Sequence, residues 1–441
     1  MRRRVAAVAL CCAGVLVASG RRASAAEDQV LMTPPPVGAP VPPATGPGAT
    51  PVSPLPSAVA AATTGPAGAP APVEKKQPAG WIPGSGFVLQ SEDAAFKLRI
   101  GLQAAYKFEP VYQAGSWQER NTFFVLRPSI SGNFFKEWIH FWTSFEFAAN
   151  PPYLLDSYVE IFPYKEFGLR IGQQFTPFDR HEYLGPQEIL MPEWAPVSEY
   201  FWTGRDKGVT AMGALFESKL EYWAGLYSGT PLRQFNALPG NYVVEGRVTW
   251  SPLGSVASVE FPYIVTEGPT PLRISFTMQG YYGKVQSAIE NFNPSTFSFQ
   301  SMPSGETRKQ GAGGADMWIY NEWFAFYMEG MVRQTEPPMG AKYTSGGLWM
   351  QASGPLIAKT MDLAARFNYL NPSTDLANDN FYSIEGQLAY YFMHTPNLVL
   401  KLRYGYGHQD AVDMAQQGAV TLVLATPGRI QLFTIQLNLM F

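Results

Sequence analysis

The sequence predicts an all-β fold: a transmembrane antiparallel β-barrel of about sixteen strands. Three observations lead to this fold class. The final segment, 432–441, places apolar residues on one face and mostly polar residues on the other. The segment 96–108 keeps the same alternation over its whole length, which is long for a soluble sheet and suits a tilted membrane strand. Aromatic residues make up 14% of the chain while its mean hydropathy is only -0.09, as expected when lipid-facing and water-facing residues alternate.

Residues 1–25 have the layout of a secretory signal peptide. Three arginines precede a short apolar run, Val5–Val17, and Ala23-Ser24-Ala25 is a small-residue cleavage site. The apolar run is too short for a spanning helix, which needs about 20 residues. Both cysteines, Cys11 and Cys12, lie in this segment. The processed protein would therefore have no disulfide and no thiol-ligated metal site.

Residues 26–80 are rich in Pro, Ala, Gly and Thr and almost free of aromatic residues. Such a composition cannot bury enough apolar surface to offset the entropy of ordering, so it predicts a disordered, partly polyproline-II spacer in the periplasm. The spacer is either a plain linker or a tether that reaches the cell wall.

The charge of the chain argues against binding to nucleic acid or another polyanion. The formal net charge is -3, and residues 1–25 contain five arginines and no acid. Their removal would leave 27 basic and 35 acidic residues, a balance of -8.

Residues 81–441 form the predicted barrel domain, because a period of two recurs there between turn residues. After 96–108, alternating strands are expected at 138–148, 154–161 and 168–175. In the second of these, Leu155 shares the apolar face with Val159, and in the third Phe175 shares it with Ile171. Later strands are expected at 242–250, 272–280, 361–369 and 396–406, with two more flanking Trp323.

We expect these strands to close into a barrel in a membrane, for two physical reasons. Backbone groups that face hydrocarbon must pair within the protein, so an open sheet edge is excluded. Aromatic residues near strand ends suit the girdles at the two interfaces; the alternative is that they are core residues of a soluble β-protein. These residues are Trp138, Tyr164, Trp250, Tyr390 and Tyr391.

The order of several motifs resembles the porin O and P family, the phosphate-selective porins of Gram-negative outer membranes. The segments that carry the resemblance are Leu154–Glu160, Leu169–Phe178, Gly204–Val209, Ala315–Trp318, Glu329, Ala365–Leu370 and Phe441. The resemblance covers roughly residues 95–441 and leaves out the spacer. It implies a sixteen-stranded barrel, usually trimeric, whose long third extracellular loop folds into the pore; here that loop is about 179–205.

Charged side chains on the inward face are the candidates for selectivity, because lumen charge and the constriction decide what a channel passes. Strand parity places these basic residues inward: Arg99, Arg127, Arg170, Arg247, Arg273, Arg366, Arg403, Lys97 and Lys401. It also places these acids inward: Glu146, Asp156, Glu160, Glu245, Glu329, Asp362 and Glu385. The resemblance implies an arginine ladder for phosphate, whereas paired acids and bases would make a general pore with a mixed lumen charge.

The predicted constriction loop carries five acids and two bases, an excess that favours weak cation preference, or little preference, over a phosphate site. Its charged residues are Asp179, Arg180, Glu182, Glu188, Glu193, Glu199 and Arg205. Arg205 and Asp206 form a charged junction where the chain re-enters the barrel. The loop aromatics either stack on sugar rings or pack the loop on the wall; they are Tyr183, Trp194, Tyr200, Phe201 and Trp202.

No catalytic, metal-binding or cofactor-binding motif is evident. The four histidines, at 140, 181, 394 and 408, lack metal-ligand spacing, and there is no nucleophile elbow. The sequence therefore predicts a passive channel for small hydrophilic solutes and ions, without enzyme activity or cofactor. Alternatives are a selective phosphate, oxyanion or oligosaccharide channel, or a structural barrel tethered to the cell wall. The expected partners are outer-membrane lipid, two further copies in a homotrimer, and the barrel-assembly machinery through Phe441.

Overall fold

The computed structural model describes residues 79–440 apart from 83–84, 94, 114, 231–239, 267, 294–297, 339, 377–378, 411–421 and 425–427. The predicted signal peptide, nearly all of the predicted spacer and Phe441 lie outside these residues. The first strand, β1, begins at Ala79, inside the range predicted as spacer.

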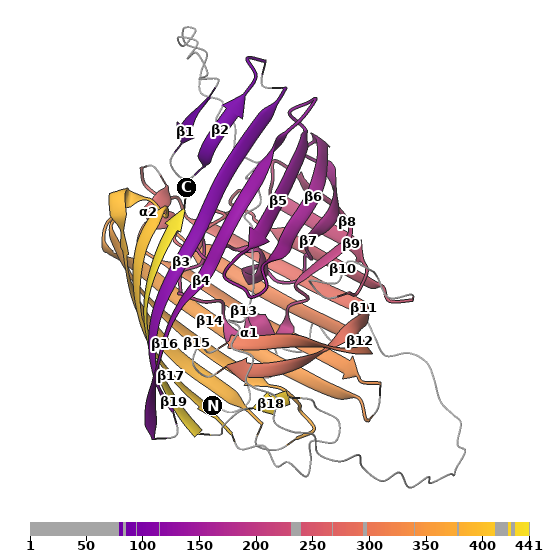
Figure 1. The fold of residues 1–441 in the computed structure, drawn as a ribbon, viewed down its shortest axis with the longest axis vertical. Helices are drawn as coiled ribbons and strands as arrows, with labels where there is room; N and C mark the ends of the chain where they lie inside the picture. The colour runs from indigo at the N-terminus through magenta and orange to yellow at the C-terminus, as the bar shows by residue number, and fades with distance from the viewer. Residues whose placement is uncertain are drawn as a thin grey trace. The chain divides into compact units, whose positions relative to one another are not determined.

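Among the described elements, sixteen strands close into an antiparallel barrel, which confirms the predicted fold class (Figure 1). Neighbouring strands pair in chain order, and β19 closes the barrel on β3. The barrel strands are β3 (Lys97–Gln113), β4 (Ser116–Asn133), β5 (Ile139–Glu146), β6 (Tyr153–Tyr164), β7 (Phe167–Phe175), β8 (Arg205–Leu215), β9 (Leu220–Tyr227), β10 (Val243–Trp250), β11 (Arg273–Asn293), β12 (Ser298–Tyr320), β13 (Ala325–Glu336), β14 (Tyr343–Ile357), β15 (Met361–Asn371), β16 (Phe381–Tyr391), β17 (Leu398–Gln409) and β19 (Gly428–Met440).

The remaining elements are short. A hairpin of β1 (Ala79–Ile82) and β2 (Gly86–Gln90) pairs with the first residues of β3, and β18 (Leu422–Leu424) pairs in parallel with β11. The helical turns are η1 (His181–Tyr183), α1 (Pro196–Phe201), α2 (Pro262–Val265) and η2 (Phe392–His394). No helix in the described part of the chain is long and apolar enough to cross a membrane.

The two faces of the last strand show the predicted alternation. On β19, Phe433, Ile435 and Leu437 are exposed, whereas Thr434 and Gln436 are fully buried on the inner side. A wall of this kind presents apolar groups to lipid and keeps polar groups for the lumen.

Strand parity fails at two residues near the ends of strands. A register shift between β5 and β6 falls at Leu155, so this side chain is buried and does not share the outward face predicted for it. Phe175, also predicted to face outward, is buried because the chain turns into the lumen directly after it, and the Arg205 guanidinium lies 3.7 Å above its ring.

The predicted aromatic girdle is also wrong at one position. Trp138, Tyr164, Trp250 and Tyr390 are exposed, as the girdle requires. Tyr391 is fully buried, and its hydroxyl donates a hydrogen bond to Asp362 at 2.7 Å, so it belongs to the lumen.

The connections differ at the two ends of the barrel. One end has mainly short turns, such as those at 165–166, 216–219 and 358–360. Strand β3 begins at this end and β19 ends there. The other end has the longer loops, including 176–204 and 372–380. The connection between β10 and β11, residues 251–272, contains α2 and is long although it lies at the short-turn end.

Candidate functional site

The segment 176–204, here called the long loop, connects β7 to β8 and folds into the barrel. Its side chains are mostly buried, among them Trp194, Val197 and Phe201, each fully buried. This placement agrees with the loop boundaries predicted from the sequence. Because the loop fills space that water would otherwise occupy, its contacts decide which part of the lumen stays open.

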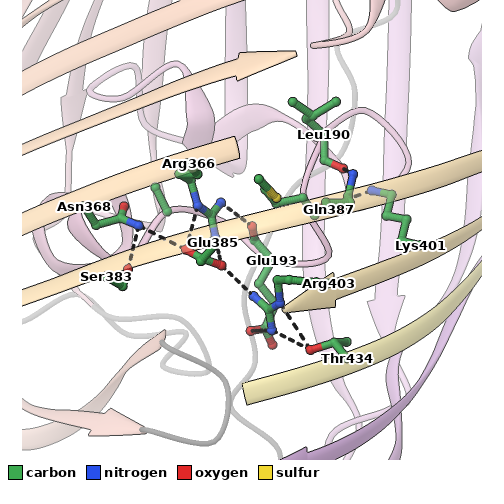
Figure 2. A network of polar contacts seen from close by, with 12 residues as sticks. Leu190, Glu193, Arg366, Asn368, Ser383, Glu385, Gln387, Lys401, Arg403 and Thr434 are labelled. Carbon is green, nitrogen blue, oxygen red and sulfur yellow. Dashed lines mark hydrogen bonds and ion pairs between the residues drawn. The ribbon is translucent and has the colours of Figure 1, made fainter. Parts of the chain in front are cut away.

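The middle of the long loop is held by polar side chains of β16 and β17 (Figure 2). Lys401 donates hydrogen bonds to the carbonyl oxygens of Ile189 at 2.7 Å, Met191 at 3.1 Å and Pro186 at 3.3 Å. Gln387 donates to the carbonyl of Leu190 at 2.6 Å. Backbone carbonyl and N–H groups buried away from water must find hydrogen-bond partners, and these side chains supply partners for the carbonyl groups of the loop.

A buried network of charges fixes Glu193 of the long loop to the same wall (Figure 2). Its carboxylate pairs with Lys107, and Arg403 lies 3.5 Å from it. Arg366 binds the Glu385 carboxylate through two hydrogen bonds of 2.9 Å and also donates to the Glu193 carbonyl at 2.8 Å. Arg403 joins the two carboxylates, since it also binds Glu385 at 3.1 Å. Buried charges of this kind persist only when they are paired.

Helix α1 packs the end of the long loop on β13 and β14. It begins with Pro196 at its first position, which suits a helix start because proline has no N–H to leave unpaired. Arg333 donates to the Tyr200 carbonyl at 2.8 Å, and the Tyr200 hydroxyl lies 3.1 Å from Ser345 Oγ. A Cβ on Gly347 would meet Val197 at 2.6 Å, so only glycine allows this close approach.

The beginning of the long loop binds the opposite wall. Tyr183 in η1 stacks on Trp223 of β9, with ring centroids 5.5 Å apart and planes 12° apart. Arg247 of β10 donates to the Tyr183 hydroxyl at 2.7 Å. Seven barrel strands separate β9 from β17 in either direction, so these two strands face each other across the lumen. The long loop therefore crosses the whole diameter.

A second inward segment, 251–272, meets the long loop from the short-turn end; sequence analysis missed it. Glu260 accepts a hydrogen bond from the Leu190 N–H at 2.7 Å, and its own N–H donates to the Glu188 carbonyl at 2.9 Å. Arg180 donates to the Ala257 carbonyl at 2.9 Å. The absence of alternation over this stretch, together with its prolines, was the signal that could have predicted it.

Burial changes the proton affinity of several loop groups. Desolvation raises the pKa of Asp179 to about 6, partly opposed by its hydrogen bond with Ser198. Desolvation also raises the pKa of Glu188 to about 8, against a hydrogen bond from the Gly185 N–H and the charge of Arg180. Burial, and then the charge of Arg366, lower the pKa of His181 well below its usual value, so that histidine is neutral.

The wall from β4 to β8 carries ion pairs between its own strands. Arg127 of β4 binds Glu146 of β5 at 2.5 Å, and Arg170 of β7 binds Glu160 of β6 at 2.5 Å. A third pair joins β8 to β6, because Arg205 binds both carboxylate oxygens of Asp156 at 2.6 and 3.1 Å.

The predicted junction of Arg205 and Asp206 has two separate roles. Arg205 belongs to the wall pair with Asp156. Asp206 instead accepts hydrogen bonds from the Ser228 hydroxyl at 2.5 Å and the Gly229 N–H at 2.6 Å, so it orders the chain that leaves β9.

A cavity of about 220 Å³ opens between the long loop, the segment 251–272 and strands β5, β6 and β8–β10. It lies toward the short-turn end. Its lining mixes charged and aromatic groups, including Glu160, Arg180, Tyr183, Glu188, Glu221, Trp223 and Arg247. Of these, Glu221 and Trp223 were missed by the sequence analysis, although both lie on the inward parity of β9.

Several predicted site residues belong neither to the contacts that hold the long loop nor to the lining of the cavity. Lys97 and Arg99 lie at the beginning of β3, and Arg273 lies at the beginning of β11, where it donates to the carbonyl of Leu272. The side chain of Glu182 lies outside the described residues. Glu199 is buried in α1 and does not face the cavity. The selectivity role predicted for all these charges stays a prediction.

Comparison with solved structures supports the porin fold. The chain is similar to an anion-selective porin from Comamonas acidovorans, with a TM-score of 0.55 and 9% identity over 78% of this chain and 99% of that one. It is also similar to OmpT, an outer membrane protein of Vibrio cholerae, with a TM-score of 0.51 and 11% identity over 80% of this chain and 100% of that one. A trimer form of OmpT matches with the same TM-score.

These likenesses concern the fold alone, because the identities are low. A scan against protein-family models and a search of curated proteins find no match. The narrower resemblance to the porin O and P family therefore stays a prediction.

Proposed function

We propose that this chain forms a passive diffusion channel for small hydrophilic solutes and ions in the outer membrane of a Gram-negative bacterium. The observation that carries the proposal is a charged cavity inside a closed barrel whose outer face is apolar. A lumen lined by ion pairs and carboxylates suits water and hydrated ions. The porin fold of the similar structures supports the same reading.

Single-channel conductance in planar bilayers tests this function, with reversal potentials in a KCl gradient and titration with phosphate. We expect discrete conducting steps that phosphate does not block. Among the inward arginines, Arg127, Arg170, Arg247, Arg366 and Arg403 each have a carboxylate partner, which disfavours a phosphate ladder. Small anion-selective channels blocked by phosphate would favour the ladder.

A structural barrel is the second candidate, favoured by the meeting of two inward segments at Glu260 and Leu190. If these segments close the lumen, the intact protein gives no conductance, and the spacer at 26–80 becomes the functional part as a tether to the cell wall. An oligosaccharide channel has less support, because Trp194, Tyr200 and Phe201 are buried in packing contacts.

The proposal also covers export, membrane insertion and assembly of the chain. A signal peptide at 1–25 would direct export, the spacer would lie in the periplasm, and Phe441 would be read by the barrel-assembly machinery. A homotrimer is proposed from the family resemblance, and one of the similar structures is a trimer form. Gel filtration and crosslinking in detergent test the assembly.

A further inference from the structure

The long loop crosses the lumen and divides it into two parts. One part lies between the loop and strands β11–β17; the other, here called the crescent, lies between the loop and strands β4–β10. We propose that solutes pass only through the crescent, and that Glu188 and Glu221 give this passage a preference for cations. This inference rests on the proposed channel function and names the residues that would set its selectivity.

The part of the lumen on the side of β11–β17 is filled with packed side chains. His181 stacks on Trp349 of β14, with ring centroids 4.6 Å apart, and Phe178 meets Tyr281 of β11 edge-on at 4.8 Å. From the segment 251–272, Phe261 packs on Tyr391 of β16 at 5.0 Å. These rings, apart from that of His181, belong to one buried apolar cluster of the long loop, the segment 251–272 and the wall, and an interior packed in this way leaves no path for a hydrated solute.

Among the described side chains of the long loop, those with exposed surface lie toward the crescent. Arg180, Tyr183 and Glu188 are half-buried and line the cavity. Leu184 lines it too but is buried, and Ile189 is fully buried. Trp202, also half-buried, lies edge-on to Trp194, which in turn contacts Phe124 of β4. The crescent is therefore where the loop still has a water-accessible face.

The charges around the cavity do not all cancel within the protein. Glu160 is paired with Arg170, and Arg247 lies 3.4 Å from Asp316. Glu188 and Glu221 have no ion-pair partner among the described residues, although both line the cavity.

The charge of Arg180, which also lines the cavity, acts on both carboxylates but can offset only one of them. Its guanidinium donates to the Ala257 carbonyl and lies 4.1 Å above the ring of Trp318. An excess of carboxylates in a passage through the protein attracts cations and repels anions, since such a passage focuses the field of its lining charges.

The first test compares a double variant, E188Q/E221Q, with the native protein and with E166Q in planar bilayers. Glu166 lies in the β6–β7 turn at the same end of the barrel, is half exposed, and does not line the cavity. The reversal potential in a KCl gradient is measured at about pH 9, where Glu188 is ionised. We expect E188Q/E221Q to lose the cation preference and E166Q to keep it. Unchanged selectivity in conducting E188Q/E221Q channels would overturn the inference.

A second test locates the path by single cysteines, because the only native cysteines are Cys11 and Cys12 in the predicted signal peptide. E221C places a thiol in the crescent. S353C is the matched control on the filled side, where Ser353 accepts a hydrogen bond from the Tyr263 hydroxyl at 2.8 Å. A cationic methanethiosulfonate reagent should reduce the conductance of E221C and leave that of S353C unchanged.

The outcomes separate the two proposals. Block of S353C, or no block of E221C, would show that solutes take another path and would overturn the inference alone. Absence of conductance in the native protein would overturn the proposed channel function, and the inference with it.

Discussion

Two walls of the barrel carry inward arginines and carboxylates: one is formed by β15–β17 and β19, the other by β4–β8. The charges of the two walls have different partners. On the first wall, here called the docked wall, Lys401, Arg366 and Arg403 reach across to the backbone or the carboxylate of the long loop. On the second, here called the cavity wall, Arg127 and Arg170 bind carboxylates of a neighbouring strand in the same wall. The docked wall uses its charges to hold a loop in place.

This difference shows that residue type and inward parity do not define the role of a lumen charge. The pair of Arg170 and Glu160 lies directly across β6 and β7 in register, so it needs nothing from the lumen. Arg403 lies among three carboxylates, two of them from the barrel and one from the loop. Removal of a charge should therefore change loop position and stability on the docked wall, and selectivity on the cavity wall.

The largest effect is expected from R403L on the docked wall. The substitution leaves Glu109, Glu193 and Glu385 with one cation fewer in a fully buried site, and such broken buried pairs destabilise by about 3–5 kcal/mol. The midpoint of unfolding in denaturant, followed by the heat-modifiable shift of the barrel on gels, should fall accordingly. R273L is the control, because Arg273 lies at a strand end and forms no ion pair with a described residue. Equal stability of R403L and R273L would refute the loop-holding role.

A smaller effect is expected from G347A, which tests the docking of α1 without changing any charge. The new methyl group would lie 2.6 Å from Val197 and 2.9 Å from Phe201, and overpacking of this kind destabilises by about 1–3 kcal/mol. G346A is a matched control on the adjacent residue, where a Cβ meets nothing within 4 Å. We expect noisier single-channel currents and lower stability for G347A than for G346A. The same behaviour in both variants would mean that α1 does not hold the loop.

Much of the fold could be predicted from the sequence, because strand alternation is a local property. The parity of β19 from Phe433 to Asn438 follows directly from its residues, as does the inward direction of Arg366, Lys401 and Arg403. The failures at Leu155 and Phe175 occur where a register shift or the end of a strand interrupts the period. Neither interruption leaves a sign in the spacing of apolar residues.

The partners of the inward charges could not be predicted, because they come from segments distant in the chain. The hydrogen bonds of Lys401 join β17 to residues about 210 positions earlier in the long loop. The contact of Glu260 with Leu190 depends on a second inward segment that the alternation rule does not describe. Selectivity therefore cannot be derived from the balance of acids and bases on the inner face alone.

The smallest effect, and the one that bears most directly on the cavity, is the pH dependence of selectivity. Burial holds the pKa of Glu188 at about 8, so this carboxyl is mostly neutral below that pH and ionised above it. Ionisation adds one negative charge to a lining that also contains Glu221, so the preference for cations should increase as the pH rises through about 8. Reversal potentials between about pH 6 and 10 measure the change.

The other titratable groups around the cavity make E188Q the necessary control. The same cavity is also lined by His140, Glu160, Lys165, Arg180, Glu221 and Arg247. Titration of another group of the lining would also change the selectivity, but that change would survive the E188Q substitution. In E188Q the step near pH 8 should therefore disappear while any step at lower pH remains. A step near pH 8 that persists in E188Q would assign the titration to another group and would mean that Glu188 does not set the selectivity of the crescent.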